Sequence, residues 1–171
     1  MMTRERYQAA LTFNDYLATV QKNQDLWHGV YQRATVAFEA AQQATAHSKK
    51  NHLLALAEDW CGDAVNLLPV VARLAESAPN VELRVLGRDA NPDIMDAHLS
   101  GDSRSIPIVI VYDEDFNEIG WWGPRPAEIQ AWVKEVGRTM EKDERYRHIR
   151  AWYARDKGRT TVREILEVMG N

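Results

Sequence analysis

The sequence is poor in cysteine: its 171 residues include only one, Cys61. A single cysteine cannot form a disulfide within the chain, so packing alone must hold the fold together. Structural disulfides are rare in reducing compartments and none can form here, and we therefore expect a cytoplasmic protein.

Long hydrophobic runs are also missing. No segment approaches the roughly 20 consecutive apolar residues that a membrane-spanning helix requires, so we expect no membrane association. The first seven residues include the charged Arg4, Glu5 and Arg6, and the chain continues to Asn14 and Asp15 without an uninterrupted apolar segment. This start does not match a secretory signal peptide.

An excess of positive charge is absent. Lys and Arg number 21, against 25 Asp and Glu, and no long basic run occurs. This balance argues against nucleic acid as a partner. The hydrophobic share of 45% and the charged share of 27% are those of an ordinary globular protein, and the length suits a single domain spanning residues 1–171.

Patterns typical of metal sites are missing as well. The five histidines are scattered, and no two of them have the i,i+4 spacing that brings two ligands together on a helix. The acidic run at 113–115 lacks the glycine and the terminal glutamate of a calcium-binding loop. We therefore predict no metal and no bound cofactor.

The apolar spacing that is present predicts alternating strands and helices. Residues 7–50 have a helical pattern, and 53–57 is a short apolar run typical of a buried strand. A strand–helix–strand order requires a parallel pair, and a hairpin after it adds antiparallel strands, so we predict an α/β fold with a mixed sheet. The predicted strands are 53–57, 81–86, 108–112 and 116–122, and the predicted helices after Cys61 are 62–78, 91–99, 127–136, 145–155 and a last one from Thr160.

Cys61 lies where the first predicted strand ends and a helix begins. Unpaired N–H groups and the helix dipole favour an anion at such a position, so the pKa of a thiol there should fall. Because chemistry in parallel sheets collects at the carboxyl ends of the strands, Cys61 is a candidate nucleophile. The structural alternative is a small buried apolar residue without chemistry.

The sequence around Cys61 is part of a wider pattern. Trp-Cys-Gly-Asp-Ala at 60–64 is followed by Ser-Ile-Pro at 105–107, a predicted hairpin and a turn at Gly123. This pattern resembles the thioredoxin family, and within it a single-cysteine branch. The resemblance covers 53–136 and implies a thioredoxin-like three-layer fold around the mixed sheet. It divides the chain into a helical N-terminal extension (1–50), a thioredoxin-like core (51–138) and a helical C-terminal extension (139–171).

The resemblance also implies roles for individual residues. Cys61 matches the family's attacking thiol, exposed at the start of the helix. Pro107 matches its cis-proline, which faces that thiol and helps bind the substrate backbone. The apolar platform around the thiol is matched by Trp60, Gly62, Ile106 and Gly123.

Three positions depart from the family pattern. Ala64 stands where the second, resolving cysteine would be, so the two-thiol cycle cannot close within one chain. Ala55 replaces the buried aspartate that assists proton transfer, and Asp63 replaces a proline of the active-site motif. A carboxylate in the first turn disfavours a thiolate beside it and so opposes the helix dipole. We therefore predict a Cys61 pKa between that of a free thiol and that of a strongly activated one.

These features predict monothiol thiol–disulfide exchange. Cys61 would attack a disulfide-containing protein or a small-thiol adduct, and an external low-molecular-weight thiol or a partner protein would resolve the mixed disulfide. Cycling through a sulfenic acid is a related route. Arg104 and Arg125 flank the two turns expected to approach Cys61, and their guanidinium groups suit the carboxylates of a small thiol. The sequence carries no indication of an oligomeric state.

Two other functions fit the same pattern. A redox-inert thioredoxin-fold module would use the groove beside Pro107 to bind a peptide or a protein partner. A monothiol scaffold would share an iron–sulfur cluster between two chains with an external thiol. Iron content tests the scaffold, and a Cys61 pKa at or above that of a free thiol, with slow alkylation at neutral pH, would favour the binding module.

Overall fold

A computed structural model describes residues 2–47 and 49–170. Met1, Ser48 and Asn171, which the predicted domain also includes, lie outside the described residues. No helix within these ranges is long and apolar enough to cross a membrane. The strands are β1 (Leu11–Thr12), β2 (Asn51–Ala57), β3 (Val81–Gly87), β4 (Ile108–Tyr112) and β5 (Glu118–Trp122), and the helices are α1 (Arg4–Ala9), α2 (Phe13–Thr19), α3 (Gln24–Arg33), α4 (Phe38–Ala46), α5 (Gly62–Ser77), α6 (Pro92–Met95), α7 (Ala127–Glu135), the short 3₁₀ helix η1 (Gly137–Thr139), α8 (Lys142–Asp156) and α9 (Arg159–Met169).

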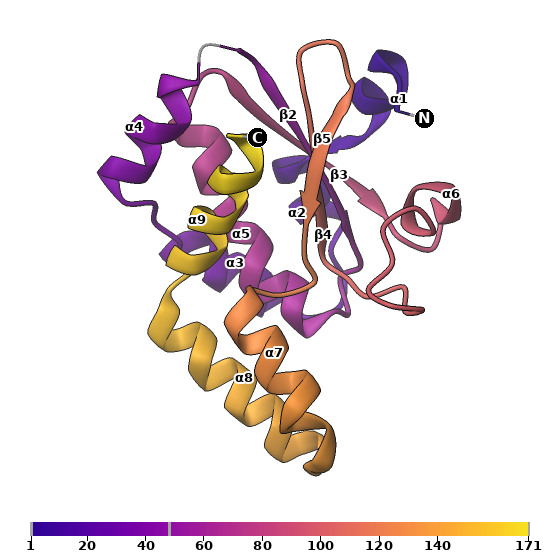
Figure 1. The fold of residues 1–171 in the computed structure, drawn as a ribbon, viewed down its shortest axis with the longest axis vertical. Helices are drawn as coiled ribbons and strands as arrows, with labels where there is room; N and C mark the ends of the chain where they lie inside the picture. Colours follow the sequence, from indigo (N-terminus) through magenta and orange to yellow (C-terminus); the bar gives the residue numbers. More distant parts are fainter. Residues whose placement is uncertain (1, 48, 171) are drawn as a thin grey trace.

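A five-stranded mixed sheet forms the centre of the structure, with the strand order β1-β3-β2-β4-β5 (Figure 1). β2 and β3 run parallel in a register that pairs Leu53 with Leu83, and α5 makes the crossover between them. β4 runs antiparallel to β2, and β5 follows it in a hairpin. Every residue of β2 is buried, as expected for a central strand that is covered on both faces. The predicted α/β fold with a mixed sheet is confirmed.

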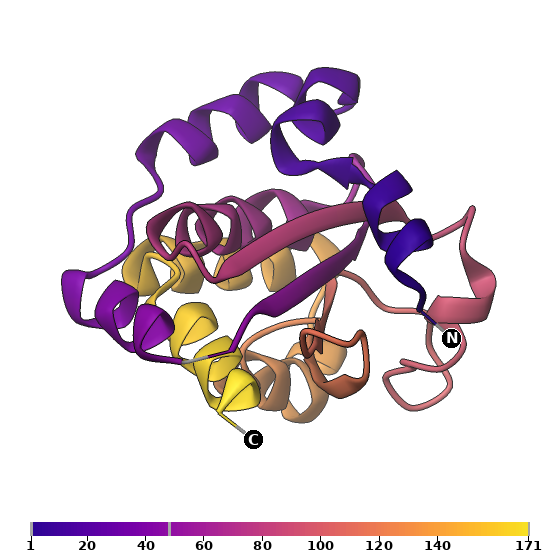
Figure 2. The same cartoon turned by 90° about the horizontal axis from the view of Figure 1, so that it is seen from above.

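Helices cover both faces of the sheet and make three layers (Figure 2). α5 and α9 pack on one face, where the Trp122 indole N–H donates to the Glu164 carboxylate of α9 at 2.6 Å. α1 and α6 lie on the other side, and the Trp121 ring meets the His98 ring edge-on just beyond α6. The two tryptophans point to opposite faces because side chains alternate along a strand. The predicted three-layer arrangement is confirmed, although α6 is shorter than the helix predicted at 91–99.

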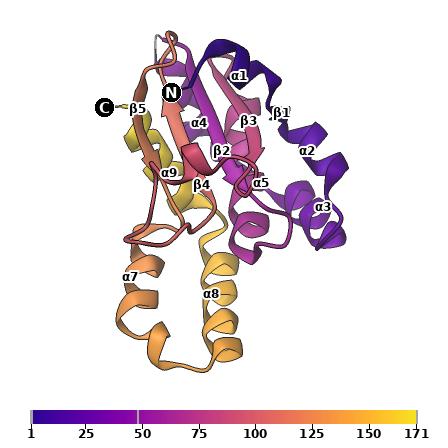
Figure 3. The ribbon, with the colours of Figure 1, turned by 90° about the vertical axis from the view of Figure 1, so that its right-hand side faces the viewer.

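α9, near the C-terminus, belongs to these layers and is not an extension of them. It packs on β4 and β5 through buried residues that include Val162, Ile165 and Leu166. α7, which we predicted as the last core helix, instead pairs with α8 in a hairpin that projects beyond the end of the sheet (Figure 3). The division of the chain at residue 138 stays a prediction, and the structure adds that α9 contributes to the cover of the sheet. The apolar face of α9 is broad enough to cover the sheet, whereas α7 buries Ile129.

The N-terminal segment also takes part in the core. We predicted a helical pattern over 7–50, but β1 interrupts the helices as an edge strand antiparallel to β3. The Thr12 hydroxyl accepts the Asp15 N–H and thereby caps α2, which requires an extended backbone at Thr12. The Tyr7 hydroxyl donates to the Leu53 carbonyl at 3.1 Å, so α1 is tied directly to β2.

Candidate functional site

Cys61 is the residue at which the chain leaving β2 enters α5. Its backbone N–H donates to the Glu58 carbonyl at 3.1 Å, which closes a turn after the strand. The Sγ atom accepts the Ala64 N–H at 3.5 Å and so caps the helix, and the thiol donates to the Ile106 carbonyl oxygen, also at 3.5 Å. These contacts place the thiol between the N-terminus of α5 and the loop before β4.

The loop opposite the thiol is held by a close backbone contact. The Ile106–Pro107 peptide bond is cis, as is the Gly123–Pro124 bond. Gly123 has a φ of +130°, and a Cβ atom there would lie 2.3 Å from the Pro107 carbonyl oxygen. Only glycine tolerates both constraints, so the turn after β5 packs directly against the Pro107 loop. The structure thus brings these two turns together beside Cys61.

The Cys61 thiol is buried, not exposed as we predicted. Only 7% of the residue is accessible. Burial raises the pKa of the thiol above that of a free cysteine, and the Asp63 carboxylate raises it further. The Ala64 N–H and the Arg125 guanidinium lower this pKa without overcoming the loss of solvation. The predicted pKa below that of a free thiol is therefore wrong, because desolvation outweighs the effect of the helix N-terminus.

Asp63 is the second buried polar group of the site. Its Oδ2 atom lies 2.6 Å from Nη2 of Arg125, and its Oδ1 atom accepts the Tyr153 hydroxyl at 2.6 Å. A buried carboxylate remains charged without a large penalty only when it is paired in this way. These three residues, the Asp63 cluster, link the first turn of α5 to the loop after β5 and to α8.

Sequence reasoning missed Tyr153 as a site residue. The structure brings its hydroxyl to Asp63 across 90 positions of sequence. Burial and the neighbouring carboxylate raise the pKa of Tyr153 well above that of free tyrosine, so it remains a hydrogen-bond donor. The one indication in the sequence was Asp63 itself, because an acid at the start of an apolar helix needs a donor when it is buried.

The two arginines predicted to bind a small thiol do not face Cys61 together. Arg125 points inward, where Asp63 and the Gln130 side-chain oxygen at 2.9 Å engage it. Arg104 is exposed and forms a bidentate ion pair with Asp96 at 2.6 and 2.7 Å. Each guanidinium therefore already has a carboxylate partner, with which the carboxylate of a small thiol would have to compete. Binding of a small thiol by Arg104 and Arg125 stays a prediction.

The exposed part of the site consists of the residues on either side of Cys61. Trp60 is 46% exposed, and the Arg88 guanidinium lies 5.0 Å from the centre of its ring. A Cβ atom at Gly62 would meet nothing within 4 Å, so the surface is open there. The Arg88 guanidinium also donates to the Arg104 carbonyl at 3.1 Å. Sequence reasoning did not include Arg88 among the site residues.

The loop that carries Trp60 is anchored by the N-terminal segment. The Asp59 carboxylate accepts the backbone N–H groups of Lys22 and Gln21 at 2.9 and 3.0 Å, and these bonds lower the pKa of Asp59. The buried Trp27 indole donates to the Asp59 carbonyl at 3.0 Å. The N-terminal helices therefore position the loop that leads into Cys61.

The two buried histidines, His52 and His98, are engaged in packing. His98 Nδ1 lies 2.7 Å from the Ile94 carbonyl, and its Nε2 lies 3.1 Å from the Glu118 carboxylate. The His52 ring stacks on Phe116 at 4.3 Å between centroids. Within residues 2–47 and 49–170, no group of three or more His, Cys, Asp or Glu side chains is placed to hold a metal ion.

The chain is similar to known proteins in sequence pattern and in fold. A family model described as Thioredoxin matches residues 10–150. The fold is similar to that of a protein of unknown function from Pseudomonas aeruginosa, with 18% identity, 99% of this chain and 98% of that chain covered, and a TM-score of 0.79. An HIV epitope scaffold matches with the same identity and coverage and a TM-score of 0.78. At this identity the two structures show the fold alone. A comparison with curated proteins gave no significant match.

Proposed function

Because this chain belongs to the thioredoxin family, we propose that it is a monothiol thiol–disulfide exchange protein in which Cys61 is the attacking group. The observation that supports this best is the position of the Cys61 sulfur, between the Ala64 N–H and the Ile106 carbonyl at the start of α5. A backbone N–H directed at the sulfur stabilises a thiolate once the proton has left.

The proposed reaction takes two exchange steps. In the first, the Cys61 thiolate attacks the small-thiol sulfur of a protein mixed disulfide, and the protein sulfur leaves as a thiolate that takes up a proton. In the second, an external small thiol attacks the new mixed disulfide, so that a small-molecule disulfide forms and Cys61 is restored. The external thiol is required because Ala64 occupies the position of a resolving cysteine. A reducing compartment such as the cytoplasm would supply it.

Burial of Cys61 controls the rate of this reaction. Since burial raises the pKa of the thiol, the thiolate is a minor species at neutral pH and the rate should rise with pH. A thiolate of high pKa is the stronger nucleophile once formed, which offsets part of its scarcity. The exposed Trp60 and the open position at Gly62 are the surface on which a substrate would approach.

Mass spectrometry of the intact protein tests the exchange function, with a glutathionylated peptide as the substrate. We expect a glutathione adduct on Cys61, release of the free peptide, and loss of the adduct when reduced glutathione is added. Cys61→Ser is the matched control because it replaces only the sulfur. If the wild type released no more peptide than this control at neutral pH and at a pH of about 9, the exchange function would be rejected.

The burial of Cys61 favours a second function, a redox-inert module that binds a peptide or protein partner. An accessible fraction of 7% and a raised pKa are properties of a cysteine that packs as a small apolar side chain. The rate of alkylation by iodoacetamide at neutral pH separates the two functions. A rate at least about tenfold below that of a free cysteine, together with no peptide release, would support the binding module.

A further inference from the structure

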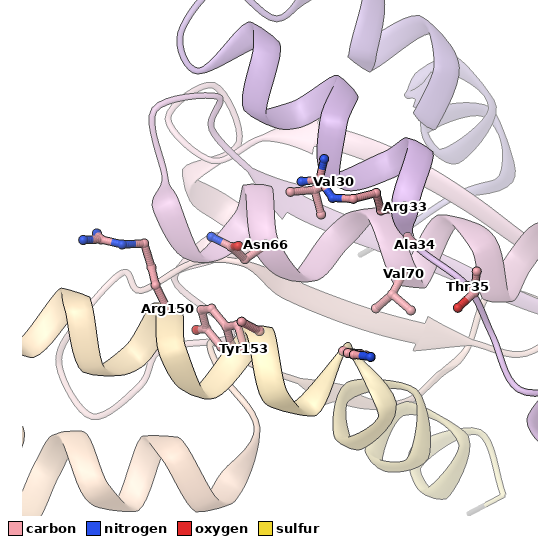
Figure 4. A pocket seen from close by; sticks show the side chains of 11 residues that line it. Val30, Arg33, Ala34, Thr35, Asn66, Val70, Arg150 and Tyr153 are labelled. Atoms are coloured by element: carbon pink, nitrogen blue, oxygen red, sulfur yellow. The ribbon is translucent and has the colours of Figure 1, made fainter.

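A cavity of about 550 Å³ lies between α3, α5 and α8. Figure 4 shows α3 on one side and α8 on the other, with Asn66 and Arg150 at one end and Val70 and Thr35 toward the other. This volume falls within the range of roughly 300–1,000 Å³ that is typical of small-molecule sites. Cys61 is not among the lining residues, although Tyr153 both lines the cavity and bonds Asp63 beside Cys61.

The charged groups that line this cavity are all positive. Arg33, Arg150 and Lys157 contribute to the lining, and no Asp or Glu does. In the described part of the chain, none of these three side chains takes part in an ion pair. Asp63, which accepts the Tyr153 hydroxyl, forms an ion pair with Arg125. The cavity is therefore electrostatically suited to an anion.

The rest of the lining is mostly apolar, with Asn66 and Thr35 as its polar side chains. Val30, Val70 and the Tyr153 ring come from α3, α5 and α8, respectively. Gly158, at the α8–α9 junction, has a φ of +76°, and a Cβ atom there would lie 2.7 Å from Val70 Cγ1. The junction is thus seated tightly against α5, and the Tyr153 hydroxyl is fixed by Asp63. The cavity is therefore built into the packing of the three helices.

A smaller cavity of about 270 Å³ adjoins the first. Both are lined by Thr35 and Gly158, so they meet at the α8–α9 junction. It lies between the α3–α4 connection, α4 and α9, and its apolar walls include Val36, Val162 and Leu166. Glu39, Arg159 and Arg163 also contribute to its lining. The cations of the first cavity and the apolar walls of the second together match a ligand with a charged head and an apolar chain.

We propose that these two adjoining cavities bind an organic anion with an apolar chain, of the class of medium-chain carboxylates. The carboxylate lies at the mouth of the larger cavity, within reach of the exposed Arg33, Arg150 and Lys157 side chains, where charge-assisted hydrogen bonds replace those that it loses with water. The chain passes Val70 and enters the smaller cavity, where burial of its apolar surface supplies the rest of the affinity. Binding does not depend on Cys61 or on the proposed exchange function.

Isothermal titration calorimetry of the full chain with octanoate tests this proposal. Octan-1-ol, which has the same chain length and no charge, should bind at least about tenfold more weakly. The double variant Arg150→Ala/Lys157→Ala should lose affinity by about tenfold, because two of the three cations are removed. Arg147→Ala/Arg155→Ala is the matched control. It removes two cations that are as exposed as Arg150 and Lys157 but do not line the cavity, and it should change the affinity by less than about twofold.

A further variant fills the cavity and leaves its charges in place. Ala154 lines the wall contributed by α8, and Ala154→Trp should abolish octanoate binding while its circular dichroism spectrum stays that of the wild type. Cys61→Ser should bind as the wild type does, whatever the outcome for exchange. The proposal is overturned if octanoate does not bind, if octan-1-ol binds equally well, if the control double variant loses as much affinity as the cavity variant, or if folded Ala154→Trp still binds.

Discussion

The Arg125 guanidinium lies 2.6 Å from the Asp63 carboxylate, and both side chains are shielded from water. This ion pair joins the loop after β5 to the first turn of α5, and the Tyr153 hydroxyl completes it. Burial is the main cause of the raised Cys61 pKa, while Asp63 adds to it and Arg125 opposes it. The same pair therefore contributes to both the stability of the fold and the reactivity of the thiol.

Replacing Arg125 should destabilise the protein strongly. Arg125→Leu leaves the buried Asp63 carboxylate without a cation, and we expect the free energy of unfolding in urea to fall by about 3–5 kcal/mol. Arg104→Leu is the matched control, because it removes an ion pair that is exposed to solvent. It should leave the stability nearly unchanged. Equal losses in the two variants would show that the buried pair has no special structural role.

Neutralising Asp63 should make the thiol more reactive. Asp63→Asn removes the carboxylate that, after burial, raises the Cys61 pKa, and it leaves the positive charge of Arg125 in place. We expect the pH profile of iodoacetamide alkylation to move to lower pH and the rate at neutral pH to rise. Asp96→Asn, whose carboxylate pairs with the distant Arg104, should leave the profile where it is. A profile of Asp63→Asn that moves to higher pH would contradict this account.

The buried thiol should make the protein less stable at alkaline pH. An unfolded chain loses the cysteine proton near a pH of about 8.5, whereas folded Cys61 keeps it to higher pH. In this interval the unfolded state binds fewer protons, so the free energy of unfolding falls as the pH rises. This stabilisation is complete below the unfolded pKa and is lost as the pH rises through the folded pKa.

Urea unfolding of the wild type and of Cys61→Ser, from neutral pH to about pH 10, measures this effect. We expect the stability of the wild type to fall relative to that of Cys61→Ser. Burial raises the pKa values of Tyr7, Tyr16 and Tyr112, so these side chains keep their protons in the folded state over this range, and they are common to both proteins. A difference that does not vary with pH would show that the folded thiol has an ordinary pKa.

The two glycines of the site should respond in opposite ways to alanine. Gly123→Ala forces a Cβ atom to within 2.3 Å of the Pro107 carbonyl at a φ of +130°, and backbone strain alone should cost about 1–3 kcal/mol. Gly62→Ala meets nothing within 4 Å and adds a better helix former at the start of α5, so it should leave stability unchanged or raise it by up to about 1 kcal/mol. Thermal unfolding compares them. Similar melting temperatures would mean that the Pro107 loop is not held by Gly123.

Most of the central fold could be predicted from the sequence because its signals are local. The apolar run at 53–57 lies within β2, and the β-branched run at 108–112 coincides with β4. A helix after Cys61, the strand that follows it and the hairpin were all expected from periodicity and from turn residues. β1 could not be found in this way, since two residues between helices carry no period of their own.

The sequence by itself determined where the thiol lies along the chain, at the junction of β2 and α5, because strand and helix patterns meet at Cys61. Only the tertiary structure decided what surrounds it. Asp63 meets Tyr153 across 90 positions of sequence, and the choice of α9 over α7 as cover for β4 and β5 depends on the path of the chain. The predicted activation of Cys61 failed for the same reason, since desolvation is the sum of all neighbouring groups and no local pattern records it.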